Sequence, residues 1–172
     1  KVVLHENDGA VRKGSLTTYQ TGSKTQFAYH VVFELDGTIV QQAAFNQKTW
    51  HVGEQDHRGA RGANGNAVGG CLVGPGRMSD TDGDGDQDAY FGPDEKQLGI
   101  RTVHGKHPHR DPGYWMDYTP AQRRSVLAFC EVMAEAYAID WIGGHWEATT
   151  RKEDPNPSLD LDALRASAAL PE

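Results

Sequence analysis

Hydrophobic residues open the chain in a short β-branched and aliphatic run at positions 1–5, which the polar stretch 6–9 ends. This pattern predicts a buried strand that carries His5 at its C-terminal end. Two further strand-like runs follow at 27–34 and 38–44, and an Asp-Gly pair separates them. Because Asp-Gly between two such runs is a strong signal for a tight turn, we predict a β-hairpin here.

The second half of the chain changes from strand patterns to helix patterns. Residues 68–73 form a short apolar run beside several glycines, which predicts an interior strand. Residues 119–122 supply an N-cap threonine, a proline at the first helical position and a capping-box glutamine. Apolar residues then recur at helical spacing, so we predict an amphipathic helix over 119–137. A shorter helix is expected to begin near residue 158 or 160.

Residues 75–117 lie between the last predicted strand and the long helix, and they show little apolar periodicity. They are rich in Gly, Asp, His and Pro, and long segments of this kind are usually functional or flexible loops. We therefore predict a long inserted loop region, which could form one wall of a binding groove.

An acidic stretch inside this region has aspartates at alternate positions and a glycine at the sixth, like the first half of a calcium-binding loop. The candidate calcium ligands are Asp80, Asp82, Asp84 and Asp86. The twelfth position is Phe91 instead of the usual glutamate, so a self-repelling, solvated loop is the alternative. Three nearby histidines form a further candidate metal cluster, with an exposed loop as the alternative: His104, His107 and His109.

Composition narrows the classes of function. The 172 residues suit one domain, and 17 basic against 24 acidic residues give a net charge of −7, the wrong sign for binding a phosphate backbone. No apolar run approaches the roughly 18 residues of a membrane-spanning helix. We expect a soluble single domain over 1–172, with no nucleic-acid partner, no membrane insertion and no obligate protein partner. Cys71 and Cys130 are too few for a disulfide framework and are expected to be buried thiols.

Candidate metal ligands lie at both ends of the chain. His145 follows a Gly-Gly pair after the predicted helix, and Asp154 precedes a proline that favours an extended or turn backbone. The two side chains could therefore converge from one ordered loop. A catalytic zinc takes three protein ligands and keeps a position open for water, and His5 is the best-placed third ligand. A lone histidine is more often solvated or hydrogen-bonded than metal-bound, so spacing alone leaves that alternative open.

Six segments in a fixed order carry a more specific signal. They are Val-Val-Leu-His at 2–5, Ala-Tyr-His-Val-Val-Phe at 28–33 with Asp-Gly-Thr-Ile-Val at 36–40, Trp-His-Val-Gly at 50–53, Ala-Val-Gly-Gly-Cys-Leu-Val-Gly at 67–74, Tyr-Thr-Pro-Ala-Gln at 118–122, and the stretch from Gly-His at 144–145 to Arg-Lys-Glu-Asp-Pro at 151–155. Together they resemble the zinc-dependent N-acetylmuramoyl-L-alanine amidases, the family of bacteriophage amidase-type lysozymes and peptidoglycan recognition proteins. The match leaves mainly residues 75–117 uncovered.

The resemblance implies a fold, an activity and a place of action. The fold is a single α/β domain with a central mixed β-sheet flanked by helices. The activity is hydrolysis of the amide between the lactyl group of N-acetylmuramic acid and L-alanine in peptidoglycan, with zinc as cofactor. A bacteriolytic enzyme of this kind, such as an endolysin, acts at the cell wall, although the sequence does not identify the compartment from which it comes.

The resemblance also implies roles for individual residues. The implied zinc ligands are His5, His145 and Asp154. Tyr29 is similar to a tyrosine that assists catalysis, and Lys152 is similar to a lysine that faces the substrate carbonyl. His51 falls where the family has a histidine lining the groove, and Trp50 beside it is a second candidate for substrate binding.

Physical chemistry is consistent with these roles. Amide hydrolysis at neutral pH needs a nucleophile stronger than water, and zinc lowers the pKa of bound water to about 7. The ammonium group of Lys152 could stabilise the oxyanion, while Tyr29 could either orient the water or protonate the leaving amine. The chain departs from the cytoplasmic recycling amidases, which carry a glutamate where this sequence has Cys71. The Tyr29 and Lys152 pair of the phage-lysozyme branch fits better.

Each of these residues also has a structural interpretation. Tyr29 could be a core aromatic residue, and Lys152 could form a solvated pair of cations with Arg151. His51 could support loop packing. His30 follows Tyr29 and faces the opposite side of a strand, so we interpret it as structural. For the whole chain, the alternatives are a non-catalytic peptidoglycan-binding domain of the same fold and a calcium-bound adhesive module.

Overall fold

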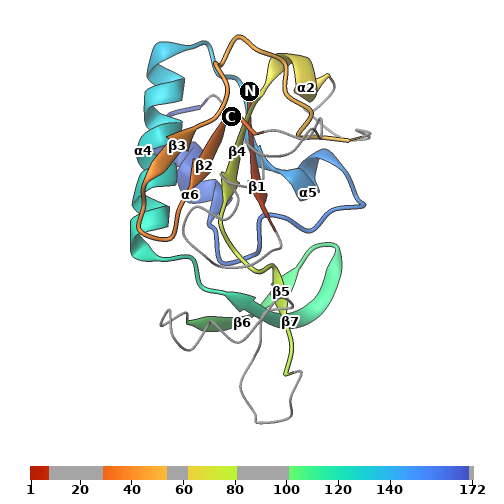
Figure 1. Cartoon of the computed structure of the whole chain (residues 1–172). Helices are drawn as coiled ribbons and strands as arrows, with labels where there is room; N and C mark the ends of the chain where they lie inside the picture. The colour runs from red at the N-terminus through yellow and green to blue at the C-terminus, as the bar shows by residue number, and fades with distance from the viewer. Residues whose placement is uncertain (8–28, 54–61, 81–100, 171–172) are drawn as a thin grey trace.

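A computed structural model describes residues 1–7, 29–53, 62–80 and 101–170 of the chain (Figure 1). Its centre is a five-stranded sheet with the strand order β3-β2-β4-β1-β8. The strands are β1 (Val2–Glu6), β2 (Val31–Phe33), β3 (Ile39–Gln41), β4 (Val68–Leu72) and β8 (Ile142–Gly144). Strand β1 pairs in parallel with β4 and β8, whereas β3 is antiparallel to β2. The sheet is therefore mixed, which confirms the predicted fold class.

The predicted hairpin joins β2 to β3. The turn contains Gly37 at a φ of 83°, a left-handed conformation that glycine adopts without strain. The backbone N–H of Thr38 donates to Asp36 Oδ1 at 2.9 Å, so the aspartate side chain stabilises the turn. A side chain at Gly37 would also collide with the first turn of the long helix, because its Cβ would lie 3.0 Å from the Ala121 carbonyl oxygen.

Four helices in the described part of the chain flank the central sheet. Helices α4 (Pro120–Ala136) and α6 (Leu161–Ser167) cover one face, and the short helices α2 (Ala63–Asn66) and α5 (His145–Ala148) lie at the other (Figure 1). Helix α6 begins after the N-cap Asp160, one of the two starting points predicted for it. No helix among the described residues is long and apolar enough to span a bilayer.

The central strand β1 serves both faces of the sheet. Val2 and Leu4 belong to the larger hydrophobic core beneath α4 and α6, whereas Val3 packs in a smaller core with residues of α2 and α5. Because side chains alternate along a strand, His5 shares the face of Val3 and Glu6 shares the face of Leu4. The last two residues of β1 thus project to opposite sides of the sheet.

Helix α4 begins as the sequence predicts. Thr119 Oγ1 accepts a hydrogen bond from the backbone N–H of Gln122 at 3.0 Å, and Gln122 Oε1 accepts one from the backbone N–H of Thr119 at 3.1 Å. The amide nitrogen of Gln122 also donates to the carbonyls of Phe33 and Val73, at 3.3 and 2.8 Å. One buried glutamine therefore caps the helix and holds its first turn against the ends of β2 and β4.

A second, smaller sheet occupies the described part of the region where we predicted a loop. Strands β5 (Arg77–Met78), β6 (Thr102–His107) and β7 (Arg110–Met116) form an antiparallel sheet with the order β5-β7-β6. Its apolar contacts come mainly from Trp115 and Met116, which are buried. Exposed strands rich in Gly, His and Pro lack a clear alternating pattern, so sequence analysis did not identify them.

The two cysteines agree with their predicted role. Cys71 in β4 and Cys130 in α4 are both fully buried thiols that form no disulfide with each other. Burial raises the pKa of the Cys130 thiol to about 12, so this group stays protonated and behaves as a small apolar side chain.

Candidate functional site

The three candidate metal ligands come together at the C-terminal end of β1. Strand β8 runs parallel to β1, with Gly144 opposite Leu4, so His145 at the start of α5 emerges beside His5. The segment carrying Asp154 returns to the same place, where its carbonyl accepts a hydrogen bond from the backbone N–H of Trp146 at 3.0 Å. The sheet topology therefore brings together residues separated by 140 and 149 positions.

The geometry of these side chains fits a divalent ion. Nδ1 of His5 lies 3.1 Å from Nδ1 of His145 and 3.2 Å from Oδ2 of Asp154, and Nδ1 of His145 lies 3.0 Å from Oδ1 of Asp154. Tetrahedral ligands about 2.0–2.1 Å from a zinc ion lie about 3.3 Å from one another. Two imidazoles and one carboxylate form a common zinc-binding set that leaves a fourth position open. Among the described residues, these three side chains form the group of His, Cys, Asp or Glu residues whose ligand atoms all lie within 4.8 Å of one another.

The protonation states also suit a cation. Burial, followed by the neighbouring His145, lowers the pKa of His5 to about 4 against the opposing effect of Asp154. Burial alone would raise the pKa of the Asp154 carboxyl, but hydrogen bonds from His145 and His5 outweigh it and hold that pKa well below its usual range. At neutral pH His5 is therefore an uncharged imidazole beside an ionised carboxylate, which are the forms that bind metal.

His51 lies directly behind His5. Its Nδ1 is 2.9 Å from Nε2 of His5, and burial together with the neighbouring His5 lowers the pKa of His51 to about 2. With a metal ion bound to Nδ1 of His5, the hydrogen of its neutral ring would lie on Nε2, which would donate it to His51. Metal-binding histidines usually donate their second N–H to such a fixed acceptor. Only 6% of His51 is exposed, so this position favours orientation of His5; substrate binding by His51 stays a prediction.

The other predicted site residues surround this centre. The ring centroid of Tyr29, which is partly buried, lies 4.9 Å from that of His5. Lys152 is exposed, and its charge is close enough to contribute to the lowered pKa of His5. Trp50 is 46% exposed, with the ammonium group of Lys48 3.8 Å from its ring centroid. The catalytic and substrate-binding roles of these residues stay predictions.

The ring of His30, which precedes β2, packs against the ring of His51, with the two centroids 5.9 Å apart, so it does not face away from the centre as strand alternation predicted. Its Nδ1 accepts a hydrogen bond from the backbone N–H of Gly69 at 2.9 Å, and its Nε2 donates to the carbonyl of Gln47 at 2.9 Å. Burial lowers the pKa of His30, so the neutral ring links two segments of backbone. His30 is therefore a structural residue.

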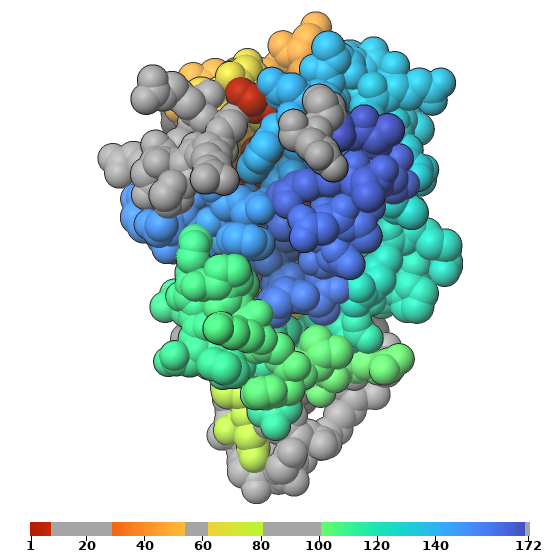
Figure 2. Space-filling view, turned by 180° about the vertical axis from the view of Figure 1, so that it is seen from behind, coloured from red at the N-terminus to blue at the C-terminus, as the bar shows by residue number. Residues whose placement is uncertain are grey.

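The tip of the β6–β7 hairpin contacts the loop that carries Lys152. His109 Nδ1 donates to the carbonyl of Lys152 at 3.0 Å, and Arg110 Nε lies 2.6 Å from a carboxylate oxygen of Glu153. From behind, the green hairpin lies against the blue C-terminal segments (Figure 2). Sequence analysis missed this contact, because a charge pair across 43 residues has no local pattern.

The acidic stretch is mostly outside the described residues. Asp80 is exposed, while Asp82, Asp84 and Asp86 lie beyond the part of the chain that the structure describes. Neither the described residues nor the related proteins support calcium, so this site stays a prediction. The three-histidine cluster does not form: His107 contacts His109, but His104 contacts the ring of Tyr114 instead.

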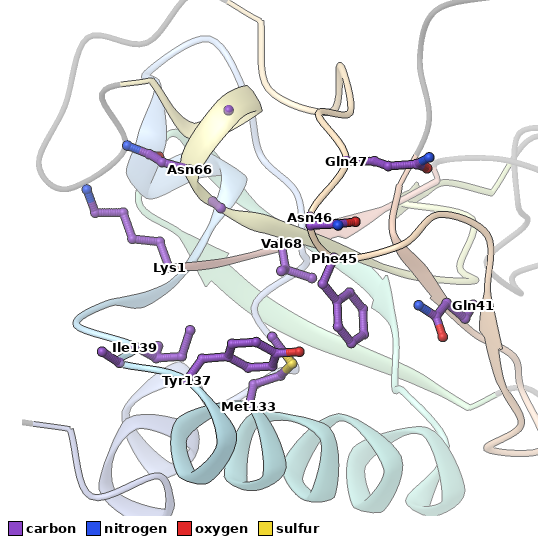
Figure 3. A pocket seen from close by; sticks show the side chains of 13 residues that line it. Lys1, Gln41, Phe45, Asn46, Gln47, Asn66, Val68, Met133, Tyr137 and Ile139 are labelled. Carbon is purple, nitrogen blue, oxygen red and sulfur yellow. The ribbon is translucent and has the colours of Figure 1, made fainter.

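A pocket of about 640 Å³ lies at the opposite end of the central sheet (Figure 3). Val68 and Lys1, at the beginnings of β4 and β1, line it together with Phe45, Met133 and Tyr137. Because His5 stands near the other end of β1, this pocket is separate from the candidate metal centre.

Known proteins share both the sequence pattern and the fold. The sequence profile described as N-acetylmuramoyl-L-alanine amidase matches residues 1–157. The 1,6-anhydro-N-acetylmuramyl-L-alanine amidase AmpD of Salmonella typhimurium is 26% identical over 144 residues, which cover 82% of this chain and 57% of that protein. This chain thus spans little more than half the length of that curated relative.

Two solved structures show the same fold at low sequence identity. One is AmiD from E. coli, in complex with the substrate anhydro-N-acetylmuramic acid-L-Ala-D-gamma-Glu-L-Lys; it has a TM-score of 0.67 and 18% identity, covering 99% of this chain and 57% of that one. The other is the endolysin of the Thermus scotoductus bacteriophage Ph2119, with a TM-score of 0.56 and 17% identity, covering 97% of this chain and 82% of that one. From its sequence profile and its fold, the chain belongs to the N-acetylmuramoyl-L-alanine amidase family.

Proposed function

We propose that this chain is a zinc-dependent N-acetylmuramoyl-L-alanine amidase, which hydrolyses the amide between the lactyl group of N-acetylmuramic acid and L-alanine in peptidoglycan. The observation that carries the proposal is the buried convergence of His5, His145 and Asp154 in a member of this family. The AmiD complex with a muramoyl peptide supports the substrate class. The site of action is then the cell wall, and one amidase domain spans 1–172, with the region 75–117 inserted.

Different residues of the chain have different roles in the proposed reaction. A zinc ion held by His5, His145 and Asp154 would supply Lewis acidity and lower the pKa of water, as amide hydrolysis at neutral pH requires. Lys152 brings a positive charge to the developing oxyanion. Tyr29, beside His5, orients the attacking water or protonates the departing amine through its hydroxyl. Cys71 cannot replace a glutamate as general base, because it is fully buried within β4.

Metal analysis and an activity assay together test the proposal. We expect one zinc per chain, release of L-alanine amino termini from purified cell walls, and reversible loss of that release on chelation. A chain that binds walls but releases no amino termini is a non-catalytic peptidoglycan-binding domain. Activity that persists after complete removal of metal contradicts the zinc mechanism.

The substitution Gly69→Ala tests the role of His51. A Cβ on Gly69 would lie only 2.6–3.0 Å from three atoms of the His51 ring, so the ring must shift from its present position beside His5. Losing the partner that orients a metal-binding histidine typically weakens metal binding about 10- to 100-fold, and we expect a loss of this size in a zinc competition titration. Gly53→Ala is the matched control, because its Cβ would meet nothing within 4 Å. Equal zinc affinity in the two variants would contradict the role.

A further inference from the structure

Glu6 places a carboxyl group in the interior beside the metal centre without belonging to it. The residue is only 4% exposed. Its Oε1 accepts hydrogen bonds from the backbone N–H of Gly76 and from Nδ2 of Asn156, both at 3.2 Å. Its Oε2 accepts one from the backbone N–H of Asn156 at 3.3 Å, and the hydroxyl of Tyr118 also bonds to the carboxyl group. A single side chain thus holds both the backbone and the side chain of Asn156.

Asn156 in turn fixes the segment that carries Asp154, two positions earlier in the chain. Its Nδ2 also donates to the carbonyl of Met116 at 3.2 Å, and its Oδ1 accepts from the backbone N–H of Ser158 at 2.9 Å. The backbone N–H of Glu6 lies 3.4 Å from Oδ2 of Asp154 itself. Glu6 therefore contacts this segment through both its backbone and its side chain.

The fold leaves a space that suits this carboxyl group. A Cβ on Gly74 would lie 2.0 Å from Oε1 of Glu6, so the carboxyl group packs against bare backbone. Burying a carboxyl group is costly even when it is hydrogen-bonded, and an apolar side chain would avoid that cost. An apolar side chain would also leave the buried donors of Asn156 without this acceptor.

We propose that Glu6 is a positioning residue of the metal centre, which sets the place of the Asp154 carboxylate relative to His5 by holding Asn156. The inference rests on the metal site of the proposed function. Because His5 and Glu6 are consecutive on a strand and face opposite sides, one strand end supplies one metal ligand and fixes the segment of another. Removal of such an outer partner weakens metal binding about 10- to 100-fold in other metal sites.

Metal binding by the full chain tests this assignment. Zinc affinity is measured by competition, and the visible spectrum of the Co²⁺-loaded chain reports ligand geometry. We expect Glu6→Ala to raise the zinc dissociation constant about 10- to 100-fold, to alter the Co²⁺ spectrum and to lower kcat on a soluble muramoyl peptide with little change in KM. Gln122→Ala is the matched control: it also loses buried hydrogen bonds, but none of them to Glu6, Asn156 or a candidate metal ligand, so its Tm falls while zinc affinity and spectrum stay as in the parent.

Two further variants keep the assignment testable. Asn156→Ala should weaken zinc binding as Glu6→Ala does, and the double variant should bind no more weakly than either single one, since both changes break one linkage. If Glu6→Ala does not fold, Glu6→Gln tests the assignment in its place. The glutamine keeps one acceptor oxygen but turns an NH₂ group toward the Asn156 N–H. Weaker zinc binding by this variant supports the positioning role of Glu6.

Specific outcomes overturn the assignment. Glu6 variants that lose thermal stability like Gln122→Ala, yet keep parental zinc affinity and Co²⁺ spectrum, reduce Glu6 to a purely structural residue and leave the proposed function standing. A parent chain that binds neither ion overturns the metal centre itself. The two failures are therefore distinguishable.

Discussion

Replacing Asp154 with alanine is expected to reduce the release of L-alanine amino termini from cell walls by roughly 1,000-fold or more. The substitution removes the sole carboxylate of the convergent group and leaves two imidazoles whose Nδ1 atoms lie 3.1 Å apart. Zinc stoichiometry should fall together with activity, because a two-histidine site lacks the third protein ligand of a catalytic zinc. The measurement pairs metal analysis of the purified variant with the amino-terminus assay.

Asp162→Ala is the matched control for this loss. Asp162 is exposed on α6, where it pairs with Arg165 at 2.9 Å, and surface pairs of this kind contribute little. The control should retain both zinc and activity. If Asp154→Ala kept zinc and lysed walls at the parental rate, the catalytic centre would have to lie elsewhere.

Replacing Lys152 with methionine is expected to lower kcat about 100-fold, equivalent to about 3 kcal/mol of transition-state stabilisation. Methionine retains much of the aliphatic chain but lacks the charge that we propose stabilises the oxyanion. Zinc content and Tm should change little, because Lys152 is exposed and the hydrogen bonds of its backbone N–H and carbonyl do not involve the ammonium group. Steady-state kinetics on a soluble muramoyl peptide separate the expected loss of kcat from any change in KM.

Arg151→Met provides the comparison for Lys152. Arg151 is the neighbouring exposed cation, and its Nε lies 3.4 Å from Oγ1 of Thr149. Removing a charge from this position should leave kcat within about twofold of the parent, since the guanidinium group has no proposed contact with substrate. Equal losses in the two variants would mean that general surface charge, and not Lys152 itself, assists the reaction.

The sequence predicted local structure well where local rules decide it. The Thr119 and Gln122 capping box, the Asp-Gly turn and the strand at 68–73 all lie where their patterns placed them. The small sheet β5–β7 was missed, because its residues are mostly exposed and its apolar pattern is weak.

The candidate site was found through resemblance more than through spacing. Nothing local connects His5 with His145; parallel pairing of β1 with β8 does so only in three dimensions. The partners that hold these side chains were harder still to predict. The contact of His51 with His5 was not predicted, and Glu6 carried no recognisable motif. Such contacts depend on long-range packing that a single sequence does not encode locally.

The central place of β1 also determines when the candidate metal centre can form during synthesis. Strand β1 is flanked by β4 and β8, and β8 is not complete until residue 144. A growing chain adds about 5–20 residues per second, so β1 waits for a neighbour that is synthesised well after it. A nascent fragment that ends before residue 154 lacks a candidate ligand of the centre. The proposed amidase activity therefore cannot arise before this residue has been synthesised.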